Sequence, residues 1–214
     1  MSGSSVGALI GNPRPRSRTL QVGLRARDGI VTALRAAAPG RAWAAGDVLD
    51  AATLAHQVFG EQSDAVARRV AQVASQRVVV VATPTYKATY TGLLKSVLDL
   101  SPPSIWEQTV AIPVQVVGSH RHTLAADVHL RPLLVELGAS TPTSSIVVAE
   151  SDLRADEGAG VVEAWLAAEA GGRALVRAVA AGNPPPAGEG AAAGGLSPRS
   201  EPATWQRTQQ VGAR

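Results

Sequence analysis

The segment RVVVVAT at Arg77–Thr83 decides the fold class of this chain. Its four consecutive valines, Val78 to Val81, are interrupted by no polar residue, so a strand formed here has two apolar faces. Such a strand must be covered by helices on both sides, which is typical of parallel sheets in α/β proteins. The segment therefore predicts a central strand of a parallel sheet.

Short β-rich runs alternate with segments of helical periodicity around this strand. The other expected strands are Val6–Ile10, Arg41–Val48, Thr109–Val117 and Ser144–Ala149. The expected helices are Thr19–Ala38, Ser63–Ser75, Thr91–Leu100, Thr123–Leu137 and Val161–Ala180. Ser63 is the expected cap of its helix, and Pro132 is expected to bend the fourth helix. The alternation predicts a doubly wound parallel α/β sheet, but the pattern alone leaves the strand order open.

Composition excludes several classes of protein. With 214 residues, the chain can bury a full core, and the lack of cysteine excludes disulfide scaffolds, thiolate metal sites and thiol catalysis. The net charge of +3 rests on scattered arginines, 18 against only 2 lysines, and gives little support to nucleic-acid binding. No apolar run approaches the roughly 20 residues of a membrane span, and Met1–Ser5 lacks the layout of a signal peptide. We expect a soluble cytoplasmic protein that binds neither nucleic acid nor membrane.

The character of the sequence changes near residue 183. Residues 1–182 are expected to form one domain, whereas residues 183–214 are rich in Pro, Gly and Ala and cannot bury enough surface to order a core. We predict that this C-terminal tail is disordered or docked on a partner. Trp205 is its only strong anchor, and a lone tryptophan in such a tail is more often incidental than a docking group.

The first strand is followed by the loop GNPRPRSRT, Gly11–Thr19, which leads into a helix. It offers backbone N–H groups at a helix N-terminus, hydroxyl and amide side chains, and three guanidinium groups. This combination suits a phosphate monoester dianion, although the Gly-Lys-Ser/Thr of a Walker loop is absent. The alternative is a solvated turn with coincidental arginines. Its position directly after the first strand favours a phosphate site.

The loop after the central strand gathers both tyrosines and both lysines of the chain: Tyr86, Tyr90, Lys87 and Lys95. Ligands of open α/β sheets bind beyond the carboxyl ends of the strands, and Tyr86 offers a flat face and a hydroxyl there. Beside a phosphate loop, such a segment is suited to a planar heterocycle. The alternative is that Tyr90 and Leu94 only cover the sheet and that Lys95 is a solvated helix residue, which we favour for Lys95.

The loop after the fourth strand, Gly118–His122, carries two histidines two residues apart. Asp127 is the nearest carboxylate, and with His129 it could imitate a metal set, but capping and hydrogen bonding fit this spacing better. We therefore expect no metal. No Gly-x-Ser-x-Gly elbow follows any of the expected strands, and no other catalytic dyad stands out, so no side chain is predicted to be catalytic. This absence favours a protein whose cofactor supplies the chemistry.

These motifs resemble the NAD(P)H-dependent FMN reductase family. The similar segments are Gly11–Thr19, Ala82–Lys95 with Asp99-Leu100, Gly118-Ser119-x-x-His122, and Leu130-Arg131-Pro132-Leu133-Leu134. The most similar branch serves two-component alkanesulfonate and methanesulfonate monooxygenases, and the resemblance runs from about Val6 to Ala180. It implies a flavodoxin-like, five-stranded parallel sheet of order 2-1-3-4-5 with helices on both faces. It further implies FMN, NADPH or NADH as cofactors and a homodimer or homotetramer.

The resemblance also implies two groups of cofactor-binding residues. The FMN phosphate would be held by Ser17, Arg18 and Thr19, with Asn12 and Arg14 assisting. The isoalloxazine ring would be lined by Pro84, Thr85 and Tyr86, with Lys87 near its edge and Gly118 and Ser119 on the other side. Hydride would pass from nicotinamide to flavin without an acid or base from the protein. The implied function is an FMN reductase that supplies reduced flavin to a separate monooxygenase.

The chain departs from the family pattern at three places. Asn12 stands where the family usually has Ser, and Val116-Val117 replace Thr-Gly before the third loop. Val128, next to His129, stands where the sulfonate-linked branch has Tyr or His, in a helix that forms a subunit interface in the family. Two other functions stay open: an FMN-containing quinone or azo-compound reductase, and a non-catalytic flavin-binding protein in which Val116-Val117 block the nicotinamide.

Overall fold

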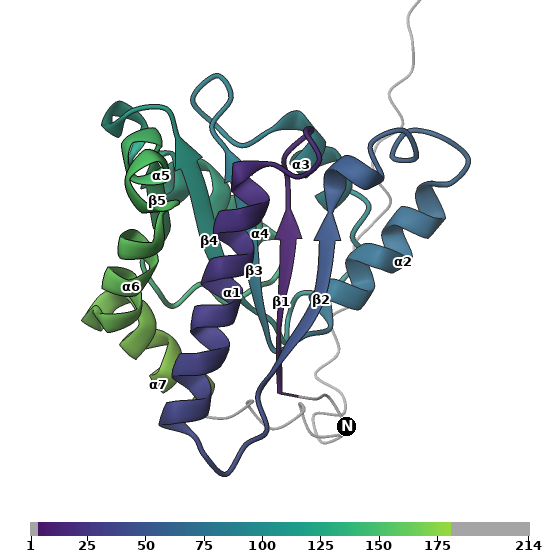
Figure 1. The fold of residues 1–214 in the computed structure, drawn as a ribbon. Helices are drawn as coiled ribbons and strands as arrows, with labels where there is room; N and C mark the ends of the chain where they lie inside the picture. Colours follow the sequence, from purple (N-terminus) through teal and green to yellow (C-terminus); the bar gives the residue numbers. More distant parts are fainter. Residues whose placement is uncertain (1–3, 181–214) are drawn as a thin grey trace, which may run out of the picture. The chain divides into compact units, whose positions relative to one another are not determined.

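Five parallel strands form one sheet in the order β2-β1-β3-β4-β5 (Figure 1). The strands are β1 (Ser5–Ile10), β2 (Ala44–Asp50), β3 (Val78–Pro84), β4 (Val110–Val117) and β5 (Ile146–Ala149). The computed structural model describes residues 4–180, so the predicted tail, residues 183–214, lies outside the described residues. The predicted fold class and the strand order implied by the resemblance are both confirmed.

The valine run lies in the middle of the sheet, as predicted. Every residue of β3 is buried, and the strand pairs with β1 on one side and β4 on the other. Successive side chains of a strand point to opposite faces, so the run feeds two separate cores. Val78 and Val80 belong to one hydrophobic cluster, and Val79 and Val81 belong to the other.

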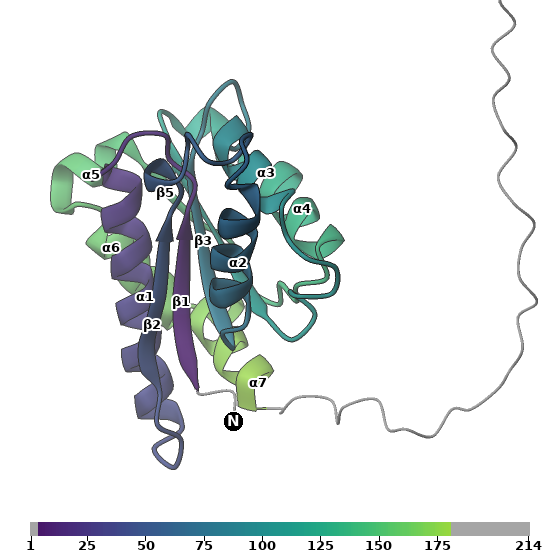
Figure 2. The same ribbon diagram turned by 90° about the vertical axis from the view of Figure 1, so that its right-hand side faces the viewer.

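Helices cover both faces of the sheet (Figure 2). One face carries α1 (Arg18–Ala37), α5 (Glu150–Asp156), α6 (Ala159–Ala167) and α7 (Ala174–Ala180). The other face carries α2 (Ser63–Ala74), α3 (Gly92–Leu98) and α4 (Arg131–Glu136). Within residues 4–180 there are also four short helical turns: η1 (Ala51–Thr53), η2 (His120–His122), η3 (Ala126–Leu130) and η4 (Glu169–Arg173).

Several local predictions need correction. The cap of α2 is Gln62 rather than Ser63, which is already the first helical residue. The predicted fourth helix is a π-helical turn, η3, followed by α4. Pro132 is the second residue of α4 and follows η3 without a break, so it lies inside a continuous helical stretch, where its missing N–H interrupts the helical hydrogen bonds. The predicted last helix is divided into α6 and α7 because Gly171 has non-helical backbone angles.

The edge strand β2 begins and ends later than the predicted Arg41–Val48, and α5 was not predicted. Ala and Gly dominate the β2 region, so its pattern carries little signal for the boundaries. No helix within residues 4–180 is long and apolar enough to cross a membrane.

Candidate functional site

The site follows from the order of the strands. The strands β1 and β3 are neighbours, but the chain leaves β1 toward β2 on one side and leaves β3 toward β4 on the other. This reversal is a topological switch point, where open α/β sheets bind their ligands beyond the carboxyl ends of the strands. The loops after β1 and β3 both lie at this edge, at the top of Figure 1.

A cleft of about 390 Å³ lies at this edge, within the size range of small-molecule sites. Its lining residues are Asn12, Arg14, Pro15, Arg16, Ser17, Arg18, Thr19, Pro84, Tyr86, Val116, Glu150 and Leu153. The structure thus brings together all five residues expected at the phosphate and two of those expected at the ring. The remaining predicted residues, Thr85, Lys87, Gly118 and Ser119, lie outside this lining.

Ser17 is the N-cap of α1 and closes the loop that follows β1. Its Oγ accepts a hydrogen bond of 3.2 Å from the N–H of Leu20, which caps the helix. The first backbone N–H groups of a helix have no intrahelical acceptors, and those of Arg18 and Thr19 belong to this first turn. They therefore present donors, together with the positive end of the helix dipole, where an anion would bind.

Asn12 holds the loop after β1 in shape. Its side chain is buried; Nδ2 donates to Oγ1 of Thr19 at 3.0 Å, and Oδ1 accepts from the N–H of Arg14 at 2.9 Å. Because Thr19 Oγ1 accepts this bond, its own hydroxyl hydrogen remains available as a donor. Asn12 thus acts on the loop itself, which agrees with an assisting role.

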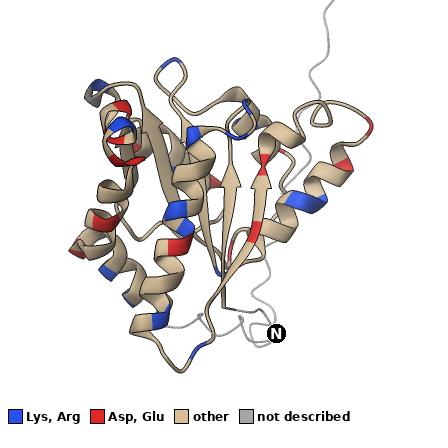
Figure 3. Cartoon of the chain, viewed as in Figure 1, with Lys and Arg blue, Asp and Glu red and all other residues tan. Residues whose placement is uncertain are grey.

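The loop carries a strong positive charge. Arg14, Arg16 and Arg18 are all exposed, and Figure 3 shows basic residues in the loops beyond the sheet and both charges on the neighbouring α5. Arg16 has a positive φ of 54°. Arg18 Nη2 lies 3.9 Å from Glu150 Oε1. The hydroxyls, free N–H groups and guanidiniums fit the phosphate end of FMN, which is the group that the sequence resemblance implies.

The ring-side loop is a tight hairpin. The backbone N–H groups of Tyr86 and Thr89 each donate to the other residue's carbonyl, at 2.9 and 3.3 Å. Between them, Lys87 and Ala88 both have positive φ, 52° and 71°, a conformation that two-residue turns usually assign to Asn and Gly. Tyr86 is 42% exposed and borders the cleft, so its ring is accessible to a ligand.

Buried threonines join the two loops beneath the cleft. Thr91 Oγ1 donates to the carbonyl of Gly11 at 2.5 Å and accepts from the N–H of Leu94 at 3.1 Å, which caps α3. Thr83 Oγ1 accepts from the N–H of Thr91 at 3.3 Å and donates to Pro84 O at 3.1 Å. The end of β1 is therefore tied to the start of α3. Sequence reasoning missed Thr91, although its place before Gly92 is a capping signal.

Three further residues near the site were also missed. Glu150 and Leu153 reach the cleft from α5. The sequence signal for this helix is Asp152 in its first turn, whose Oδ2 accepts a hydrogen bond from the N–H of Ala149, the residue before the helix, at 2.8 Å. Gln115 is fully buried on β4 and donates from Nε2 to Thr85 Oγ1 at 2.9 Å, while its Oε1 has no partner among the described residues. The sequence signal for Gln115 is that it is a polar residue in an otherwise apolar strand.

Lys95 does not contribute to the cleft. It forms an ion pair with Asp99 on the exposed side of α3, as the alternative for Lys95 predicted, and this hydrogen bond raises the pKa of the Lys95 ammonium. The described residues contain no group of three or more His, Asp or Glu side chains that could hold a metal ion.

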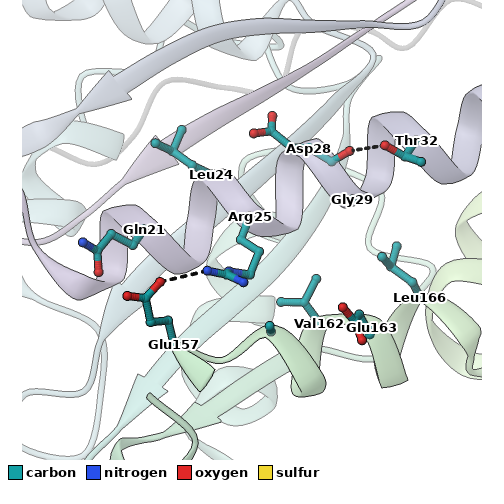
Figure 4. Close-up of a pocket in the computed structure, with 11 residues that line it drawn as sticks. Gln21, Leu24, Arg25, Asp28, Gly29, Thr32, Glu157, Val162, Glu163 and Leu166 are labelled. Carbon is teal, nitrogen blue, oxygen red and sulfur yellow. Dashed lines mark hydrogen bonds and ion pairs between the residues drawn. The ribbon is translucent and has the colours of Figure 1, made fainter. Parts of the chain in front are cut away.

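Larger grooves exist elsewhere, but their chemistry is different. The groove between α1 and α6, about 580 Å³, has apolar walls at Leu24, Val162 and Leu166, and the ion pair of Arg25 with Glu157 at 3.0 Å crosses it (Figure 4). Another groove of about 570 Å³ lies between α1 and β2. Both run along helix α1 rather than at the switch point, so we place the candidate site in the smaller cleft.

The chain is similar to known proteins over the segment that contains the cleft. A family model described as NADPH-dependent FMN reductase matches residues 4–153, a range that includes all five strands and both loops of the cleft. The FMN reductase (NADPH) of Escherichia coli K12 is 44% identical over 61 residues, 28% of this chain and 32% of that protein. The NADH-dependent FMN reductase SfnE of Pseudomonas putida is 31% identical over 93 residues, 44% of this chain and 50% of that protein. The matches with these curated relatives therefore span between a third and a half of the relatives' length.

Solved structures show the same architecture. The apo form of an NADH:FMN oxidoreductase (EMOB) is 26% identical, with a TM-score of 0.60 over 75% of this chain and 86% of that chain. An oxidoreductase from Corynebacterium diphtheriae has a TM-score of 0.69 and 24% identity over 82% of this chain and 97% of that chain, and this likeness shows the fold alone.

Proposed function

Because the chain belongs to the NADPH-dependent FMN reductase family, we propose that it transfers hydride from NADPH or NADH to FMN bound in the cleft at the switch point. One observation carries the proposal. The loops that follow β1 and β3 meet at a single cleft, where the phosphate-type donors of Ser17, Arg18 and Thr19 face the same space as Pro84 and Tyr86. A ligand with a phosphate at one end and a flat ring at the other fits this division.

In this proposal the residues of the chain bind and orient, and the flavin supplies the redox chemistry when bound. Ser17, Arg18 and Thr19 hold the phosphate, while Asn12 keeps their loop in shape. Pro84, Thr85 and Tyr86 line the ring together with Val116, Lys87 lies near its edge, and Gly118 and Ser119 lie on its other side. Holding the two reactants in a fixed relation is the main contribution of such a site to the rate.

Turnover assays test the proposal. Purified protein should oxidise NADPH or NADH only when FMN is added, as followed by the loss of the absorbance of the reduced nicotinamide. The absence of any flavin-dependent turnover would refute it. FMN that co-purifies, combined with ping-pong kinetics toward quinones, would instead favour the quinone or azo-compound reductase. Flavin binding without turnover on either nicotinamide would identify a non-catalytic flavin-binding protein.

We further propose that the reduced flavin leaves for a separate monooxygenase. The support is the resemblance of the three loop motifs to the branch that serves sulfonate monooxygenases. A purified FMNH₂-dependent alkanesulfonate monooxygenase, supplied with this protein, FMN and reduced nicotinamide, should release sulfite from an alkanesulfonate. If the protein reduces FMN but adds no sulfite to the amount released without it, the proposal is contradicted. The cytoplasmic location stays a prediction of the sequence, to be tested by cell fractionation.

We also propose a homodimer or homotetramer. Leu124, Val128 and Val135, in and near η3 and α4, are 68%, 57% and 54% exposed, which is unusual for three neighbouring apolar side chains. A Val128→Glu variant should have a smaller mass in light scattering than the unaltered protein. Phe59→Glu is the matched control, because Phe59 is also apolar and exposed but lies outside this segment.

A further inference from the structure

Glu150 contributes a negative charge to a cleft that is otherwise built for an anion. It is the one carboxylate among the described residues that line the cleft, whereas Arg14, Arg16 and Arg18 contribute three positive charges. Glu150 is the first residue of α5; its side chain lines the cleft and is 44% exposed. Three residues further along the chain, Leu153 lines the same cleft.

The two oxygens of Glu150 face two different arginines. Oε1 lies 3.9 Å from Arg18 Nη2, and Oε2 lies 3.5 Å from Arg154 Nη1. Arg18 is the guanidinium expected to hold the phosphate, so a phosphate in the cleft must share it with Glu150. The carboxylate and a phosphate dianion are both attracted by the positive charge of Arg18, and the two anions repel each other.

We propose that Glu150 lowers the affinity of the cleft for the phosphate of FMN, so that the flavin exchanges as a substrate instead of staying as a prosthetic group. The inference rests on the proposed function, because it concerns the same cleft and the same ligand. Glu150 would thus tune the binding of the flavin without taking part in hydride transfer. A flavin that leaves after reduction requires limited affinity, and a carboxylate beside the phosphate arginine provides it.

The size of the effect follows from the exposure of the pair. The side chains of Arg18 and Glu150 are 58% and 44% exposed, so solvent screens their interaction. Removing one screened carboxylate beside a dianion should lower the Kd for FMN by roughly 1.5- to fivefold. The effect should shrink at high salt, since the screening length falls to about 3 Å at 1 M.

The test compares Glu150→Gln with the unaltered protein. The Kd values for FMN and for riboflavin, which lacks the phosphate, are measured by quenching of flavin fluorescence at low and high salt. We expect FMN to bind more tightly to the variant and riboflavin to bind equally to both. Glu157→Gln is the matched control, because it removes an exposed carboxylate that pairs with an arginine of the same helix, Arg25, outside the cleft. Glu150→Ala provides a second variant with the same expectation.

Each outcome decides between explanations. An unchanged Kd for FMN in both Glu150 variants would overturn the inference while leaving the proposed function intact. Weaker binding of FMN would also overturn it and make Glu150 a positioning residue that orients Arg18. An equal gain for riboflavin would show that the effect does not act through the phosphate. If the unaltered protein binds no FMN at all, the proposed function itself fails.

Discussion

Thr91 offers a direct test of how the two loops of the cleft are held together. Its hydroxyl is buried, caps α3 by accepting from Leu94 N–H, and donates to the carbonyl of Gly11, 80 residues away in the chain. Thr91→Val keeps the shape of the side chain and removes both hydrogen bonds. The substitution isolates the hydroxyl from the packing.

The expected loss of stability has two parts. Losing a helix cap costs about 1 kcal/mol. Leaving the buried carbonyl of Gly11 without a good donor costs about 1–3 kcal/mol, because the other hydroxyl in reach, Thr83 Oγ1, is 3.5 Å away and already donates to Pro84 O. Thr91→Val should therefore lose about 2–4 kcal/mol, or roughly 5–15 °C in Tm for a domain of this size.

Urea unfolding measures this loss, with the fluorescence of the buried tryptophans Trp43, Trp106 and Trp165 as the signal. Thr91→Ser is the matched control: it keeps the hydroxyl and removes one methyl group, which costs about 0.8 kcal/mol. If Thr91→Val is no less stable than Thr91→Ser, the hydrogen bonds do not hold the loops, and the reasoning is wrong.

Three further perturbations test other parts of the structure. Arg18→Ala should raise the Kd for FMN roughly 10- to 150-fold, the equivalent of about 1.5–3 kcal/mol, and leave the Kd for riboflavin unchanged. Arg25→Ala, on the same helix, is the control. Equal weakening of both flavins would refute the phosphate assignment. Gly11→Ala should cost about 1–3 kcal/mol in urea unfolding, because its Cβ would lie 2.5 Å from Leu94 Cβ, and an unchanged midpoint would contradict this close approach. Burial opposes the ionisation of Asp127, but hydrogen bonds from Ser145 and Arg131 and the charge of Arg131 hold its pKa below the ordinary value of 3.8. The ionised carboxylate therefore contributes fully to stability above that value, and the contribution is lost as the pH falls through the lower folded pKa. When Tm is measured as the pH is lowered below about 4, the Tm of Asp127→Asn should fall less than the Tm of the unaltered protein.

Much of the fold could be predicted from local pattern. The valine run of β3 indicated a strand covered on both faces, and the structure places it in the middle of the sheet with a core on each side. Side-chain alternation and helical periodicity depend only on residues close together in the chain, so they can be recognised without knowledge of tertiary contacts. Where the pattern was weak, as in the Ala- and Gly-rich β2, the predicted boundary was displaced.

Only part of the candidate site could be predicted from the sequence. The rule that ligands bind beyond the carboxyl ends of strands pointed to the loop Gly11–Thr19 and to Pro84 and Tyr86, and these residues do line one cleft. Glu150 was missed because its helix was not predicted, and nothing local to it indicates that it faces Arg18. Gln115 stood out only as a polar residue in an apolar strand, with no indication that Thr85 was its partner.

By itself, the sequence determined the class of sheet, its cover of helices, and the loop chemistry that suits a phosphate, since these depend on residue type and on spacing along the chain. Tertiary structure decided which of those groups meet. The bond from Thr91 to Gly11 and the approach of Glu150 to Arg18 join residues 80 and 132 positions apart. Such contacts arise from how strands are ordered and how helices pack on them, and a long-range packing relation leaves no periodic signal in the sequence.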